Sequence, residues 1–367
     1  MLKKWKVAAV IATGLVILQI SGAAADNAAS FSVDQIVQLS KQNNLDDKIT
    51  DYNQGLIKLR QAYTPSPFAM GGWSSTYALS VAPLINAAQQ KASDYATLNT
   101  KLQRELNYYN AAYTYWLLEK SAVVSAKNLN LATQERDTTQ KKLDAGLASQ
   151  NDLLQSEVSL NTATNANQAA KLAMEMQQYK INQLIGDALI IPIDVSDLQL
   201  TYLSPDDLNV NSVVEDLTNN HQSLASIQTS LTAYQTASSI VAKQTDSNVQ
   251  VQVQGLTDYY QKEIVGTQMQ LQKQQQVLEF LSRSYIDRLN NAADAIKLDQ
   301  ENLDKTQQVY DNSAKLYEVG MITFSDLEKI RLNLLNVNLA LYSAEKNYMS
   351  LNQEFRLVKQ GCLPAQG

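Results

Sequence analysis

Several residue types that build reactive sites are scarce in this chain of 367 residues. It has one histidine, His221, expected at the surface or the end of a helix, and one cysteine, Cys362, expected in the tail, so no internal disulfide can form. We find no metal-ligand spacing of His, Cys, Asp and Glu, no phosphate-binding or dinucleotide-binding glycine pattern and no nucleophile elbow. The sequence therefore predicts that the protein is not an enzyme and that it uses no cofactor and no metal.

Proline and glycine, which interrupt regular structure, are also sparse. No proline lies between Pro83 and Pro192, and none lies between Pro205 and Pro364. Alanine, leucine, glutamine and lysine fill these spans, and all four are good helix formers. At ~1.5 Å per residue, residues 84–142 would form a helix of about 90 Å. The sequence predicts extended helices rather than a compact globule.

Long apolar runs are confined to the N-terminus. Three lysines precede an apolar run at Val7–Ile20, and Ala23–Ala25 offers small residues for cleavage. This pattern predicts a secretory signal peptide over residues 1–25, and an uncleaved membrane anchor is the alternative. The net charge of -6 becomes about -9 after cleavage, so we expect an acidic exported protein without a nucleic-acid partner.

One segment occurs twice. The residues from Lys142 to Leu153 recur from Leu316 to Leu327, and their glycines, Gly146 and Gly320, lie 174 positions apart. Such a duplication predicts one supersecondary unit built twice. The predicted domains are the first repeat at 26–186, a linker at 187–207, the second repeat at 208–361 and a tail at 362–367.

Apolar residues after each repeated turn follow a heptad pattern, which predicts antiparallel coiled-coil hairpins with tips near Gly146 and Gly320. In the second repeat the heptad positions are Leu327, Leu334, Leu341, Tyr348 and Phe355, preceded before the turn by Leu289, Ile296, Leu303, Tyr310 and Tyr317. In the first repeat they are Leu153, Leu160, Met174 and Ile181, with Asn167 as the polar exception. A hairpin of this length must bury its remaining apolar face against neighbours.

Two segments alternate apolar and small or polar residues with period two, which is typical of β-strands. They span residues 63–84 and 244–272, and each is barely long enough for two membrane strands of about 9–11 residues. Two alternatives remain open from the residues alone. The segments could be short hairpins that cap a helical bundle, or the helix could continue through Tyr260 to Gln272.

The duplication, the signal peptide and the tip motif together resemble the TolC-like outer-membrane efflux protein family, over essentially the whole mature chain. The motif is Gly-x-x-Ser/Thr-x-x-Asp-Leu at Gly146 and Gly320, and residues 32–44 are similar to the family's opening helix. The resemblance implies a mainly α fold of duplicated coiled-coil hairpins with short β segments. It implies a TolC-like α-barrel with a small or reduced β-barrel in the outer membrane.

The resemblance also implies partners and site residues. It implies a homotrimer in outer-membrane lipid that meets a periplasmic adaptor, which connects it to an inner-membrane pump. The adaptor is expected at the two tips, which are Ala145, Gly146 and Leu147, and Val319, Gly320 and Met321. The tunnel gate is expected at Asp152 and Asp326, and capping of a helix N-terminus is the alternative role for these two positions.

The sequence departs from the family pattern at two positions. Lys329 stands where TolC itself has a second acidic ring, and Ile322 stands where a basic partner would close the gate, so the closed-state lock is not carried over. We expect a trimeric outer-membrane channel of a tripartite efflux or type I secretion system, a passive conduit from periplasm to exterior. The alternative is an exported coiled-coil structural or interaction protein that has lost the membrane pore. An adaptor would carry one hairpin, and the duplication argues against it.

Overall fold

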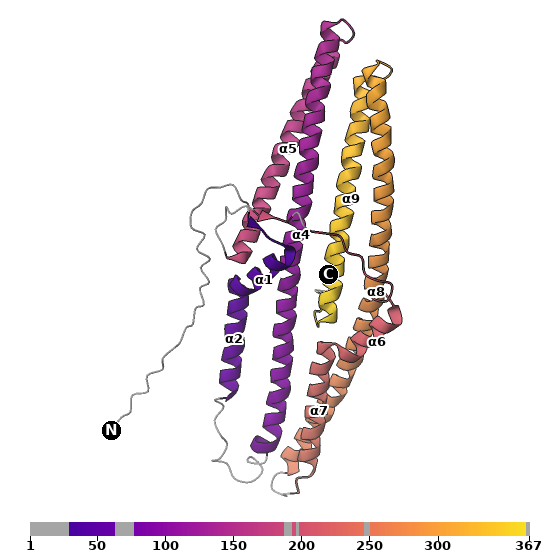
Figure 1. Cartoon of the computed structure of the whole chain (residues 1–367). Helices are drawn as coiled ribbons and strands as arrows, with labels where there is room; N and C mark the ends of the chain where they lie inside the picture. The colour runs from indigo at the N-terminus through magenta and orange to yellow at the C-terminus, as the bar shows by residue number, and fades with distance from the viewer. Residues whose placement is uncertain (1–28, 63–76, 187–192, 196–197, 246–249, 365–367) are drawn as a thin grey trace, which may run out of the picture.

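Long helices lie side by side in one curved row in the computed structural model of the chain (Figure 1). The structure describes residues 29–62, 77–186, 193–195, 198–245 and 250–364. Among these residues, no helix combines the length and the apolar character needed to cross a membrane.

The described elements follow one another in an order that repeats. They are β1 (Ala29–Ser30), α1 (Val33–Asn43), α2 (Leu45–Ala62), the π-helix η1 (Tyr77–Val81), α4 (Ala82–Asp144), α5 (Gln150–Ile185), β2 (Ile193–Asp194), α6 (Val210–Asn220), α7 (Gln222–Ala242), α8 (Gln250–Glu318) and α9 (Phe324–Lys359). The two short strands pair in parallel, with Ala29 opposite Ile193. Helices α1 and α6 have 11 residues each, and α5 and α9 have 36 each.

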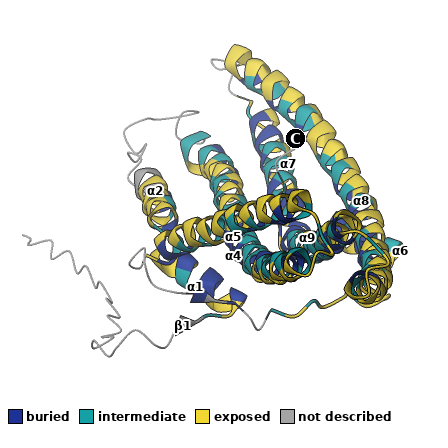
Figure 2. Cartoon of the chain, turned by 90° about the horizontal axis from the view of Figure 1, so that it is seen from above, coloured by how far each residue is buried: buried dark blue, intermediate teal, exposed yellow. Residues whose placement is uncertain are grey.

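Two hairpins, α4 with α5 and α8 with α9, dominate the molecule (Figure 1). Helix α4 has 63 residues and α8 has 69, so they extend for ~95 Å and ~100 Å. In the half nearer the tips the order across the row is α5, α4, α9, α8, and in the other half it is α2, α4, α7, α8. Figure 2, which looks along the helices, shows α9 between α4 and α8. We call this row of helices the helical wall.

The predicted heptad positions of the second repeat form the seam of its hairpin. Leu327, Leu334, Leu341, Tyr348 and Phe355 are all less than a tenth exposed. In the first repeat the polar exception Asn167 is buried as well, and its side-chain oxygen accepts a hydrogen bond from Ser125 of α4 at 3.3 Å. The coiled-coil prediction is confirmed in both repeats.

The two segments that the alternation predicted as strands are helical over most of the part that the structure describes, and only residues 244 and 245 there lie outside a helix. Residues 77–84 form η1 and the start of α4, and residues 250–272 belong to α8. Residues 63–76 and 246–249 lie outside the described part. The buried residues of this part of α8, Val253, Tyr260 and Thr267, repeat every seven positions. A heptad spacing that suits the neighbouring helices therefore prevails over the alternation of valine with glutamine, as the helical alternative anticipated.

The lone histidine and the lone cysteine meet at the joint between α7 and α9. His221 precedes α7, where its Nδ1 accepts from the backbone N–H of Ser223 at 3.2 Å, so the prediction of a helix end is confirmed. Its side chain is 2% exposed rather than at the surface. Cys362 is fully buried beside Leu102 and Leu357, because the turn after α9 directs the chain back onto α4, and so it belongs to the core rather than to a free tail.

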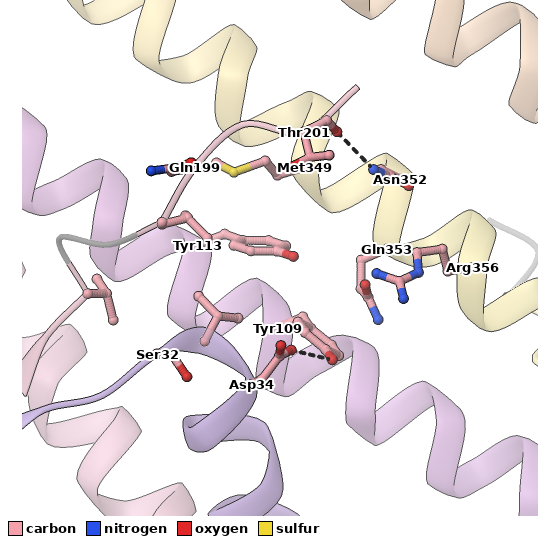
Figure 3. A pocket seen from close by; sticks show the side chains of 13 residues that line it. Ser32, Asp34, Tyr109, Tyr113, Gln199, Thr201, Met349, Asn352, Gln353 and Arg356 are labelled. Carbon is pink, nitrogen blue, oxygen red and sulfur yellow. Dashed lines mark hydrogen bonds between the residues drawn. The ribbon is translucent and has the colours of Figure 1, made fainter. Parts of the chain in front are cut away.

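A cavity of about 300 Å³ lies where α1, α4, α9 and the segment after β2 meet (Figure 3). We call it the α1 cavity. It joins elements of both repeats at mid-height of the helical wall, far along the chain from either tip.

Candidate functional site at the hairpin tips

Both tips end in the same turn. The backbone N–H of Leu147 donates to the carbonyl of Lys142 at 2.7 Å, and the N–H of Met321 donates to Leu316 at 2.8 Å. Gly146 and Gly320 sit inside these turns with φ of 71° and 76°, a region that favours glycine. The turn satisfies the last carbonyls of each long helix and reverses the chain within a few residues. The repeated sequence therefore codes for a repeated turn.

The tips present apolar side chains to solvent. Leu147 is 78% exposed, Val319 69% and Met321 74%, and Ala145 and both tip glycines are exposed too. A single chain gains nothing from apolar side chains at these points, because no residue that the structure describes covers them. Such exposure is typical of a contact surface for another protein.

The two predicted gate residues cap the returning helices. Ser149 and Thr323 are the N-caps of α5 and α9, and each accepts a hydrogen bond from the backbone N–H of its aspartate at 3.2 Å. The hydroxyls donate back to Asp152 Oδ2 at 2.7 Å and Asp326 Oδ2 at 2.6 Å. These hydrogen bonds lower the pKa of both carboxyl groups. Both aspartates are therefore ionised near neutral pH in the capped geometry.

Sequence reasoning missed a contact that joins the two tips through Tyr317 of α8. The Tyr317 hydroxyl lies 3.1 Å from Thr139 Oγ1 on α4, and its backbone carbonyl accepts from Lys142 Nζ at 2.9 Å. The same ammonium lies 3.6 Å from the centre of the tyrosine ring. Burial raises the pKa of Tyr317, and Asp152 adds to the shift. Tyr317 was predicted as a seam residue, and its position before the tip glycine was the only signal of a further role.

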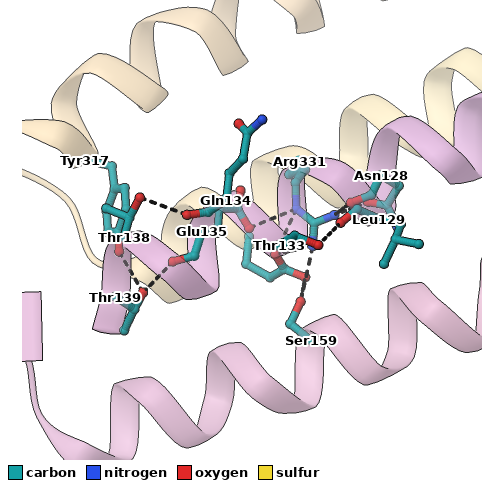
Figure 4. A network of polar contacts seen from close by, with 11 residues as sticks. Asn128, Leu129, Thr133, Gln134, Glu135, Thr138, Thr139, Ser159, Tyr317 and Arg331 are labelled. Atoms are coloured by element: carbon teal, nitrogen blue, oxygen red, sulfur yellow. Dashed lines mark hydrogen bonds and ion pairs between the residues drawn. The ribbon is translucent and has the colours of Figure 1, made fainter. Parts of the chain in front are cut away.

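A buried polar network joins the hairpins farther from the tips (Figure 4). Arg331 of α9 is 2% exposed, yet it carries a charge. Its guanidinium contacts Glu328 on its own helix, Glu135 and Asn128 on α4, and Ser159 on α5. The distance from Nε to Glu135 is 3.1 Å, and from Nη2 to Ser159 Oγ it is 3.2 Å. One side chain thus connects three helices of two hairpins.

Two carboxyl groups share this guanidinium. Burial raises the pKa of Glu135 to about 8, with Arg331 opposing the shift and Glu328 adding to it. The network therefore binds a proton near neutral pH, because one buried cation cannot fully compensate two buried anions. The sequence held no signal for this network, because its partners are up to 203 positions apart.

The two departures from the family pattern have local explanations. Ile322 is half-buried in a small apolar cluster with Tyr317, Phe324 and Leu327, so it stabilises its own tip. Lys329 is exposed and lies 3.8 Å from Asp326 on the same helix. In the described part of the chain, no group of three or more His, Cys, Asp or Glu side chains could hold a metal ion.

The chain matches no protein-family model and no curated protein sequence. Solved structures do match. The CmeC outer membrane channel of Campylobacter jejuni aligns with a TM-score of 0.70 and 11% identity, over 91% of this chain and 87% of that one. The outer membrane protein VceC of Vibrio cholerae gives 0.67 and 10%, over 90% and 96%. The open-state MtrE outer membrane channel of Neisseria gonorrhoeae gives 0.58 and 11%, over 92% and 91%. The chain therefore has the TolC-like fold of these outer-membrane channels.

Proposed function

We propose that the chain assembles as a homotrimer in the outer membrane and forms the channel of a tripartite efflux or type I secretion system. It acts there as a passive conduit from periplasm to exterior. The shared fold with outer-membrane channels supports this function. The observation that carries it is a pair of exposed apolar stripes, one on each edge of the helical wall.

The first stripe runs along the edge formed by α5 and α2. Residues 18 positions apart on a helix share one face, because 18 residues complete five turns. The stripe on α5 consists of Leu154, Val158, Leu172 and Met176, and all four are more than half exposed. Helix α2 extends this edge with Leu45, Ile49, Tyr52 and Leu56.

Helix α2 directs its polar face toward the protein and its apolar face toward solvent, which is the reverse of an ordinary surface helix. Its polar side faces α4, where Asp47 pairs with Arg104 at 2.9 Å and the Gln54 side chain accepts a hydrogen bond from Thr97 at 3.1 Å. Its apolar side faces solvent, with Leu45 at 68% exposure and Tyr52 at 67%. A helix of this kind needs a further apolar partner beyond the described part of its own chain.

The second stripe runs along α8, at the opposite edge. Phe280, Leu298 and Leu316 lie 18 positions apart on one face of this helix, and their exposed fractions are 69%, 60% and 40%. When the α5 edge of one copy packs against the α8 edge of the next, a head-to-tail contact forms, and a constant rotation closes it into a ring. The curvature of the helical wall favours closure, and the family resemblance supports a ring of three copies.

The tips complete the proposal. Ala145, Gly146 and Leu147 with Val319, Gly320 and Met321 are the contact surface for a periplasmic adaptor that leads to an inner-membrane pump. Asp152 and Asp326 line the entrance of the tunnel. In a threefold arrangement their ionised carboxylates attract cations and disfavour anions. Helix capping holds these side chains in place and is compatible with this role.

Disulfide cross-linking tests the ring. Val158 lies 12 positions after Gly146 on α5, and Val309 lies 11 before Gly320 on α8, so each exposed side chain sits about three helical turns from its own tip on opposite edges. In a C362A background, the V158C/V309C double variant in detergent should form a covalent trimer on oxidation. Each single variant should not. Neither should V158C/V123C, because Val123 is exposed on α4 away from both edges. If V158C/V309C forms no covalent trimer, the proposed ring is refuted, and so is the proposed conduit.

A second candidate function is favoured by the helical state of residues 250–272, because the sequence predicted these residues as membrane strands of a pore and they belong to α8. In this case the protein is an exported coiled-coil structural or interaction protein without a membrane pore. Cell fractionation separates the two candidates. Recovery in the membrane fraction with ion conductance in planar bilayers supports the channel, and recovery in the soluble envelope fraction without conductance supports the second candidate.

A further inference from the structure

The α1 cavity has polar walls. Neither the proposed adaptor contact at the tips nor the proposed packing of copies along the apolar stripes accounts for them. Its lining includes Asp34 of α1, Tyr109 and Tyr113 of α4, and Asn352, Gln353 and Arg356 of α9. Its volume of about 300 Å³ is at the lower end of the range for small-molecule pockets. The floor is apolar where Met349 and Tyr113 contribute, and both side chains are buried.

Opposite charges stand on two walls of the cavity without pairing (Figure 3). Asp34 on α1 accepts a hydrogen bond from the Tyr109 hydroxyl at 3.1 Å. Arg356 projects from the last turn of α9, and both charged groups are exposed. Within the described residues, neither group forms an ion pair. Both act on Tyr113 between them: burial raises the pKa of that hydroxyl to about 12, Asp34 adds to the shift and Arg356 opposes it.

The amide groups of the cavity are only partly paired. Gln353 is 6% exposed and directed into the cavity, and its side chain makes no hydrogen bond to any residue that the structure describes. Asn352 donates to the Thr201 carbonyl at 3.4 Å, but its Oδ1 is buried without a partner there. Buried amides are normally hydrogen-bonded, and leaving them unpaired is costly. A ligand in the cavity would give the buried Asn352 Oδ1 a partner.

We propose that the α1 cavity binds a small zwitterion of the size of a free amino acid, with its ammonium group at Asp34 and its carboxylate at Arg356. A carboxylate suits a guanidinium because the two can form parallel hydrogen bonds. Gln353 and Asn352 supply hydrogen bonds to a polar side chain of the ligand. This site goes beyond the proposed channel function and does not depend on it.

An occupied cavity would hold the two repeats together. The ammonium group contacts α1 of the first repeat, and the carboxylate contacts α9 of the second. A ligand that binds only the folded chain stabilises it by mass action, so the melting temperature rises with ligand concentration.

Calorimetry and thermal denaturation of the purified full chain test the site with L-glutamine as the probe. Two analogues serve as matched controls: N-acetyl-L-glutamine lacks the ammonium, and L-glutaminamide lacks the carboxylate. We expect saturable binding and a rise in melting temperature with L-glutamine, and about tenfold weaker binding for each analogue. No saturable binding of L-glutamine, or equal binding of all three compounds, would overturn the proposal.

Charge-removing variants assign the two ends of the probe. D34N should bind L-glutamine about tenfold more weakly and should no longer distinguish it from N-acetyl-L-glutamine. R356Q should also bind L-glutamine about tenfold more weakly, and it should no longer distinguish L-glutamine from L-glutaminamide. The controls are K359Q, one turn farther along α9, and D294N on the exposed side of α8, which should bind as the unmodified chain does. Circular dichroism verifies that all four variants are folded, and wild-type affinity in both D34N and R356Q would refute the assignment.

Discussion

The buried charge of Arg331 makes the R331M variant the sharpest test of how the two hairpins are held together. Methionine has a comparable length but no charge, so the change leaves Glu135, which is 5% exposed, and Glu328 facing each other without a cation. Removing one partner of a buried ion pair typically costs about 3–5 kcal/mol. We therefore expect R331M to lower the free energy of unfolding by roughly this amount, at one fixed protein concentration.

Urea denaturation followed by circular dichroism measures this loss. The matched control is K329M, which removes an exposed cation of the same helix that lies 3.8 Å from Asp326. Exposed ion pairs contribute ~0–1 kcal/mol, so K329M should unfold near the midpoint of the unmodified chain. The double variant R331M/E135L should recover part of the loss, because it removes one unpaired carboxylate together with the cation. If R331M unfolds at the same urea concentration as K329M, the network does not hold the hairpins together.

Three further predictions concern the Arg331 network and the hairpin tips. In the unmodified chain Glu135 keeps a proton that the unfolded chain releases, so between pH 4.5 and about 8 its contribution to the free energy of unfolding falls as pH rises, by up to ~1.4 kcal/mol per pH unit. In E135Q this dependence of the free energy of unfolding on pH should be absent. An identical pH dependence in both proteins would contradict the raised pKa of Glu135. Leucine at both Gly146 and Gly320 should leave the proposed trimer assembled on native gels but abolish the proposed export, whereas G255L within α8 should affect neither. Y317F should lower the free energy of unfolding, measured in urea, by about 1 kcal/mol, because it removes one hydroxyl contact with α4. An unchanged free energy of unfolding would show that this contact does not stabilise the tip.

The helical body of the molecule could be predicted from the sequence because its signal is local. Heptad spacing reports which face of a helix is buried, and Leu341 and Phe355 lie on the seam where that spacing put them. The tip turns were predictable for a similar reason, since Gly146 and Gly320 occupy a conformation that other residues rarely adopt.

The strand prediction for residues 250–272 failed because two periods coexist there. Val251 and Val253 alternate with glutamine, but Val253 also begins a heptad with Tyr260 and Thr267. Only the second pattern matches what α8 contacts, because Tyr260 packs in one cluster with Val241 of α7. Tertiary contacts decide between such patterns, and they are not visible in a single sequence.

The Arg331 network and the α1 cavity were out of reach for a different reason. Each joins side chains from helices that are distant along the chain, such as Asp34 and Arg356. Charged residues on a long helix are usually solvated, so neither Arg331 nor Glu135 could be distinguished from its exposed neighbours by type or spacing. Their roles follow from the way the two hairpins align, which the sequence alone does not specify.

The helical wall combines two unbroken helices with two rows that are interrupted at mid-height. Helices α4 and α8 act as stiff rods along the whole molecule, whereas α5 and α9 end where α2 and α7 begin. At one joint the Asn43 amide donates to the carbonyl of Ile185 at 2.7 Å, and at the other His221 meets the end of α9. We therefore expect the helical wall to bend most easily at these joints when a partner pushes on the tips, because two of its rows have no continuous helix across this level.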